Sequence, residues 1–348
     1  MGMGYTPLRV GRSFFFSRYN FVDGVVKDNL IVGTNMTNGW ELRRLAWSVG
    51  TEFGGDRFSW NIVVGRQQAK LDDGVLLSRV SDGISGHFHV RTVQVDATVG
   101  YTGWTQERST NMSLMADTNH RVIGGVVAAM PVWFFSFVRV GTAGSVDLRT
   151  NFSSSFGVFF AGVQGALGEW FGYQAKAWYE MGSIVLTNLS KPDPVSAWAS
   201  EASLFVGKKG FPIQGRMRLF LASGEGKADG WNRFVPLGEM ESSQVLLHPA
   251  GNLTLVQMQA TWRTLASRLG VSLGYDLLWR QEKQDITLVS LYGDGLFLGQ
   301  EFVLQVVGKI DPSVKVFATG GVFLKGDGFG LNRDKPLYQV SGGLSIEL

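Results

Sequence analysis

Residues 301–310 read Glu-Phe-Val-Leu-Gln-Val-Val-Gly-Lys-Ile. Successive side chains of a β-strand point to opposite faces, so a period of two separates the two sides of a strand. One side of this segment is apolar and carries Phe302, Leu304, Val306 and Ile310. The other side is polar and carries Glu301, Gln305 and Lys309. The pattern predicts a strand that lies between an apolar and a polar environment.

The same alternation recurs along the chain, for example in residues 172–181 and 268–280. Most segments keep an apolar side for about 10 residues, the length of a tilted strand that crosses a bilayer. Aromatic residues with a polar group lie near the segment ends, where barrels place their interfacial girdles. They are Tyr101, Trp104, Trp262, Trp279 and Tyr338. We therefore expect an all-β transmembrane barrel rather than a water-soluble sandwich.

Composition supports a membrane barrel. The chain has 348 residues, of which 45% are hydrophobic and 18% charged. A membrane helix needs about 20 consecutive apolar residues, and the longest apolar run, 126–135, is shorter and contains Pro131. The absence of cysteine excludes disulfides and thiolate metal sites, and a net charge of +3 does not suggest a nucleic-acid partner. Residues 1–30 lack a signal-peptide pattern, so we expect a mature exported chain.

Short turns and long polar loops alternate along the sequence. Short turns are expected at Gly54–Asp56, Phe88–Arg91, Met130–Pro131, Ala166–Glu169, Gly207–Gly210, Leu265–Ser267 and Asp311–Ser313. Long loops are expected at 20–38, 70–77, 105–118, 144–151, 183–195, 223–249, 282–297 and 325–336. Bacterial barrels have short periplasmic turns, long extracellular loops and an even strand number. Residues 1–348 are thus predicted to form a single antiparallel up-and-down barrel domain of about 16 strands, with both termini periplasmic. The weakest turn, Phe88–Arg91, leaves 14 or 18 as alternatives.

If the apolar sides face lipid, the opposite sides line a lumen. The pore-lining candidates are Arg44, Arg91, Arg139, Lys176, Arg216, Arg218, Arg263, Arg268, Arg280, Glu301, Lys309 and Lys315. The acidic residues on the same sides are Asp96, Glu180, Glu201, Asp276 and Glu301. Rings of Arg and Lys favour anions, and the Arg fork suits carboxylates. The excess of basic residues predicts a preference for anionic, hydroxyl-rich solutes, although any one Arg can equally serve only to pair with a neighbouring acid.

Other chemistry has little support in the sequence. His87 and His89 share a strand face, but no Cys or third nearby His completes a metal site. No Ser or Asp dyad with His stands out by its spacing. We expect no enzyme, no catalytic residue, no metal and no cofactor. Asp72-Asp73 is either a Ca²⁺ ligand pair or a solvated turn, and loop 223–249 either folds inward as a constriction or stays outside.

Four ordered motifs then suggest a family. They are Gly65-Arg66-Gln67 followed by Asp73-Gly74 and Asp82-Gly83; residues 173–182, Tyr-Gln-Ala-Lys-Ala-Trp-Tyr-Glu-Met-Gly, with Ala197-Trp198-Ala199; residues 218–225, Arg-Leu-Phe-Leu-Ala-Ser-Gly-Glu, with Asp229-Gly230 and Phe234; and Gly299-Gln300-Glu301. Across roughly residues 57–325 this set resembles the bacterial alginate export family of outer-membrane barrels. The resemblance implies a Gram-negative porin-like channel with an electropositive lumen. It also implies that Arg66, Arg218, Glu225 and Glu301 are polar channel or rim residues.

The expected function is transport of an anionic small solute, or of an acidic oligo- or polysaccharide, through a barrel embedded in outer-membrane lipid. The final residue, Leu348, departs from the aromatic residue that usually ends such barrels. The alternative is a barrel that sheathes a partner protein or presents loops, with little conductance. Lumen aromatics such as Trp178, Phe317 and Phe323 motivate it. The sequence leaves open the oligomeric state and any protein partner.

Overall fold

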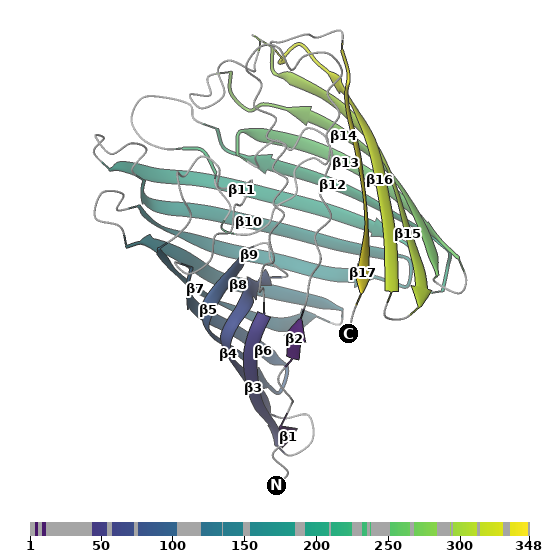
Figure 1. The fold of residues 1–348 in the computed structure, drawn as a ribbon. Coiled ribbons are helices and arrows are strands. Elements are labelled where there is room, and N and C mark those ends of the chain that lie inside the picture. The colour runs from purple at the N-terminus through teal and green to yellow at the C-terminus, as the bar shows by residue number, and fades with distance from the viewer. Residues whose placement is uncertain are drawn as a thin grey trace.

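The fold is a single large antiparallel β-sheet that curls round on itself (Figure 1). The computed structural model describes residues 4–5, 9–11, 44–53, 58–72, 76–102, 120–133, 135–148, 154–184, 192–208, 210–224, 232–234, 237, 251–264, 268–283, 293, 295–311, 314–329 and 335–346. Among them no helix is long and apolar enough to cross a membrane.

Each long strand pairs with the next one along the chain. The strands are β1 (Gly4–Tyr5), β2 (Arg9–Gly11), β3 (Arg44–Phe53), β4 (Phe58–Leu71), β5 (Leu77–Val90), β6 (Val93–Tyr101), β7 (Arg121–Trp133), β8 (Ser136–Asp147), β9 (Ser155–Leu167), β10 (Phe171–Ile184), β11 (Asp193–Val206), β12 (Ile213–Ala222), β13 (Leu253–Arg263), β14 (Leu269–Trp279), β15 (Phe297–Asp311), β16 (Val314–Lys325) and β17 (Leu337–Ile346). Antiparallel pairings join each strand from β3 to β17 to the next one without a break. This confirms the predicted all-β, up-and-down antiparallel architecture.

The strand number agrees with the sequence pattern. The sheet has 17 described strands, but β1 and β2 pair with successive parts of β3, Val49–Gly50 and Arg44–Ala46. Both lie on the edge of β3 that is opposite β4. They therefore occupy one position, and the described strands fill about 16 positions.

The predicted turns Ala166–Glu169 and Gly207–Gly210 overlap the β9–β10 and β11–β12 connections. Gly54–Asp56 and Leu265–Ser267 lie outside the described residues, and of Asp311–Ser313 only Asp311, the last residue of β15, is described. Two predictions are displaced: Phe88–Val90 still pair within β5, so that turn is at residues 91–92. The turn between β7 and β8 is not at Met130–Pro131, because Pro131 pairs with Phe137 and Trp133 pairs with Ser136. The register is irregular between Pro131 and Trp133. Proline lacks the N–H that a regular ladder needs and is found at such irregularities. Pro131 therefore lies at a strand irregularity and not in the turn that the sequence predicts there.

The two faces of the sheet differ as the alternation predicts. On β10, Ala175, Ala177 and Tyr179 are exposed, while Lys176 and Trp178 between them are buried. We call the face with the buried residues the inward face. Large apolar side chains are exposed on the opposite face, among them Leu204, Met217, Leu273 and Phe302. In a bilayer such exposed apolar side chains contact lipid.

Two segments from the long-loop side fold into the barrel. Leu71, Leu76 and Leu77, at the tip of the β4–β5 hairpin, belong to the buried apolar cluster. Phe234 and Leu237, between β12 and β13, belong to it as well. The described part of loop 223–249 therefore follows the inward alternative. The long-loop half of the interior is packed, and the functional groups lie around and below this packing.

Candidate functional site

A row of polar side chains crosses the inward face from β8 to β15. Residues that are opposite each other on neighbouring strands point to the same face. The register aligns Arg139 with Gly162, Gly162 with Lys176, and Lys176 with Glu201. Two residues further along β11, it aligns Ser203 with Arg218, then Gln257, Asp276 and Glu301. We call Arg139, Lys176, Glu201, Arg218, Gln257, Asp276 and Glu301 the polar belt.

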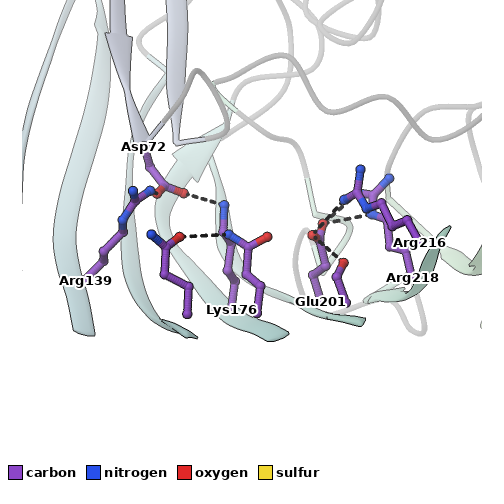
Figure 2. Close-up of polar contacts among 9 residues, drawn as sticks. Asp72, Arg139, Lys176, Glu201, Arg216 and Arg218 are labelled. Atoms are coloured by element: carbon purple, nitrogen blue, oxygen red, sulfur yellow. Dashed lines mark hydrogen bonds and ion pairs between the residues drawn. The ribbon is translucent and has the colours of Figure 1, made fainter. Parts of the chain in front are cut away.

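Glu201 is the centre of one ion-pair cluster in this belt (Figure 2). Its Oε2 accepts a hydrogen bond from Arg218 Nε at 2.9 Å and lies 2.8 Å from Arg218 Nη2. Arg216 Nη2 lies 3.6 Å from its Oε1, and the Ser203 hydroxyl donates to Oε1 at 3.3 Å. Glu201 and Arg218 are both buried. One carboxylate thus balances two guanidinium groups.

Further along the belt the charges are acidic. Gln257 Nε2 donates to Asp276 Oδ2 at 3.1 Å. Asp276 is directly opposite Glu301 on the neighbouring strand, and both are buried. The belt therefore changes from a mixed, cation-rich part on β8–β12 to a carboxylate pair on β14–β15.

A second cluster joins the belt to the inward-folded hairpin (Figure 2). Asp72 directly follows β4. Its Oδ1 accepts a hydrogen bond from Arg139 Nη1 at 2.8 Å, and its Oδ2 accepts one from Lys176 Nζ at 3.0 Å. The Asp72 side chain is fully buried. The sequence suggested a Ca²⁺ ligand or a solvated turn at this position, and neither describes the observed contacts. The signal for burial is the three leucines, Leu71, Leu76 and Leu77, that flank the acidic turn.

Below the belt, toward the short turns, the inward face lines a partly open cavity of about 670 Å³. Its charged lining consists of Arg216, Arg263 and Lys309, and the described residues that line it include no carboxylate. Amides and hydroxyls complete the polar lining and come from Gln214, Gln259, Thr261, Ser272 and Gln305. The cavity offers several hydrogen-bond donors and a net positive charge to a solute.

The remaining candidate residues lie at the ends of strands. Lys315 is opposite Lys309 on the neighbouring strand. Arg268 is exposed just before β14, and Arg91 is exposed in the turn between β5 and β6. Arg280 follows β14 and uses its guanidinium on the backbone carbonyls of the next loop, at Lys283, Gly293 and Gly295. Arg44 is the first residue of β3.

In the part of the chain that the structure describes, no group of three or more His, Cys, Asp or Glu side chains could hold a metal ion. His87 Nδ1 instead lies 2.8 Å from Asp96 Oδ1 on the neighbouring strand. The contact shown for His87 is thus a cross-strand interaction with a carboxylate.

The fold resembles solved structures of porins. The chain is 8% identical to OccK10 (OpdN) of Pseudomonas aeruginosa, with a TM-score of 0.54 over 88% of this chain and 84% of that one. It is 9% identical to OpdQ of the same organism, with a TM-score of 0.58 over 86% of this chain and 84% of that one. Neither family models nor curated proteins match the chain, so the resemblance to the alginate export family is not confirmed. The comparisons show a porin-like β-barrel fold.

Proposed function

We propose that this protein is a channel of the bacterial outer membrane that passes anionic or hydroxyl-rich solutes, including acidic oligosaccharides. The porin-like fold and the exposed apolar outward face support a barrel in outer-membrane lipid. The observation that carries the choice of solute is the inward cavity lined by Arg216, Arg263 and Lys309. A basic cavity on the inward face of a barrel suits the passage of solutes rather than catalysis.

The cavity lining suits a sugar acid. Guanidinium and ammonium groups attract a carboxylate, and the guanidinium fork can bind it through two parallel hydrogen bonds. The amides and hydroxyls of the cavity can exchange hydrogen bonds with sugar hydroxyls. With both termini on the periplasmic side, the short turns and the cavity are periplasmic as well. The cavity would then meet a solute at the periplasmic end of the barrel.

The alginate export resemblance adds an acidic polysaccharide to the candidate solutes. Of its four motif residues, Arg218 and Glu301 belong to the polar belt, and Arg66 lies 3.5 Å from Asp82 on the neighbouring strand. Glu225 lies outside the described residues. The resemblance thus supports two belt residues as part of the solute path.

Reconstitution in planar bilayers tests the proposal. The purified barrel is expected to conduct ions. In a KCl gradient, the sign of its reversal potential should show that Cl⁻ permeates more readily than K⁺. Proteoliposomes should swell faster in gluconate or galacturonate than in a cationic solute of similar size. Absence of conductance, or cation selectivity, would reject the proposed function.

A second candidate function has a specific observation in its favour. Trp178 of β10 packs on Phe234 with ring centroids 6.4 Å apart, so the inward-folded segment contacts the wall above the belt. Such packing is also expected of a barrel that sheathes a partner or presents loops. In that case the protein would insert into planar bilayers without conducting ions. Deletion of residues 232–237 would then not produce conductance.

A further inference from the structure

The tip of the β4–β5 hairpin leaves the barrel wall. Among the described strands, β3 pairs with β4 only as far as Arg66, and β6 pairs with β5 only from Asp82 onward. Residues 67–71 and 77–81 therefore pair only with each other in the described sheet. Leu71 reaches β7, where a Cβ on Gly125 would lie 2.8 Å from its Cδ1. The hairpin tip is thus folded across the interior toward β7–β10.

Asp72 connects this tip to strands β8 and β10, where its carboxylate is bound as that of a ligand would be. Each oxygen of its carboxylate contacts a different cation, Arg139 on β8 and Lys176 on β10 (Figure 2). The strand between them, β9, has Gly162 at the aligned position. A Cβ there would lie 3.3 Å from Lys176 Cγ, so glycine leaves the two cations room to converge. Asp72 and Lys176 are 104 residues apart in the sequence, so this contact depends wholly on the folded hairpin.

We propose that Arg139 and Lys176 form a carboxylate-binding site that the protein's own Asp72 occupies, and that a polyanionic solute displaces Asp72 and releases the hairpin. This proposal rests on the proposed function in one respect, because the solute must be an anion that enters the barrel. The site recognises a carboxylate by one guanidinium and one ammonium. Its natural ligand is a chain of uronate-like units rather than a single carboxylate.

The preference for a chain of carboxylates follows from competition with a tethered group. A group held by a short linker has an effective concentration on the order of millimolar. A single free carboxylate must exceed that concentration to replace Asp72. An oligomer can place a second unit in the neighbouring cavity of Arg216, Arg263 and Lys309. The link between its units then raises the effective concentration of its carboxylate at the Asp72 site, so the oligomer displaces Asp72 at a lower concentration than a single carboxylate.

A cysteine reporter tests displacement without using conductance. The chain has no native cysteine, and Leu76 and Leu77 at the hairpin tip are at most 1% exposed. In the full-length Leu76→Cys protein, reconstituted in vesicles, a membrane-impermeant maleimide should react slowly. Tri-galacturonate should raise the labelling rate at least about tenfold, whereas maltotriose, which is neutral, should leave it unchanged.

The variants that complete the test are Asp72→Asn and, as the matched control, Asp82→Asn. Both remove one carboxylate from the same hairpin, but the ion pair of Asp82 is with Arg66 on the neighbouring strand β4. Asp72→Asn should label fast without ligand and show no further response to tri-galacturonate. Asp82→Asn should behave like the parent reporter.

Three results would overturn the proposal: fast labelling of both Leu76→Cys and Leu77→Cys in the otherwise unaltered chain, no response to tri-galacturonate, or an equal response in the Asp72→Asn background. Bilayer recordings on the same proteins separate the two claims. A labelling response without conductance supports the carboxylate site and rejects the channel. Conductance without a labelling response supports the channel and rejects the site.

Discussion

Replacement of Glu201 by Gln should make the proposed channel more selective for anions. Glu201 Oε2 accepts a hydrogen bond from Arg218 Nε at 2.9 Å and lies 2.8 Å from Arg218 Nη2, and its Oε1 lies 3.6 Å from Arg216 Nη2. An anion that approaches these guanidinium groups passes close to the same carboxylate. Two unit charges about 4 Å apart interact by about 1 kcal/mol in water and by more in a less polar surrounding. Removal of that repulsion should raise the anion-to-cation permeability ratio at least about fivefold, because 1.4 kcal/mol corresponds to a factor of ten.

The measurement is the reversal potential in a KCl gradient, with parent and variant recorded in the same lipid. Glutamine keeps an oxygen that accepts from Arg218, so the wall should remain intact. Ser203→Ala is the control, because Ser203 donates to the same carboxylate at 3.3 Å and carries no charge. An unchanged ratio in Glu201→Gln, or a shift toward cations, would refute the role of this cluster in selectivity.

Three further variants test the packing and the cavity. Gly125→Val should destabilise the barrel by about 1–3 kcal/mol through overpacking, because a Cβ there would lie 2.5 Å from a backbone oxygen. Heat-modifiability on gels should show a lower unfolding temperature for this variant. Gly308→Ala is the control and should unfold at the temperature of the parent, because a Cβ there has no atom within 4 Å. Phe220→Ala removes a side chain that is 0% exposed and should cost about 3–5 kcal/mol, and an unaltered urea midpoint would contradict its place in the interior. The double variant Arg263→Glu, Lys309→Glu should reverse the sign of the cavity lining and lower the anion-to-cation permeability ratio, and a ratio equal to that of the parent would show that ions do not pass this cavity.

Period-two alternation predicted the architecture because the two faces of each strand meet different solvents. It identified Lys176, Arg218 and Glu301 as residues of one face, and the register brings them into one belt. Alternation cannot predict which charges meet, since pairing depends on register between strands. Glu201 illustrates this limit, because its two arginines lie on the next strand and reduce the positive excess that a simple count suggested.

The inward fold of the β4–β5 hairpin tip could not be predicted from the sequence for a different reason. A long polar segment between two strands normally stays in water, and Asp72-Asp73-Gly74 has the composition of such a turn. The inward course depends on contacts with strands far along the chain, which no local pattern contains. The flanking leucines were the only local sign that this turn would be buried.

The change of charge along the polar belt has an electrical consequence. Together with Asp72 and Arg216, the part on β8–β12 contains four cations and two carboxylates, while the part on β14–β15 contains the two carboxylates Asp276 and Glu301. Opposite formal charges on different sectors of one wall create an electric field across the lumen, transverse to the direction of transport. A molecule with a permanent dipole will rotate to align with that field as it crosses the belt. Zwitterions such as amino acids should therefore pass in one preferred orientation, with the carboxylate toward β8–β12 and the amine toward β14–β15.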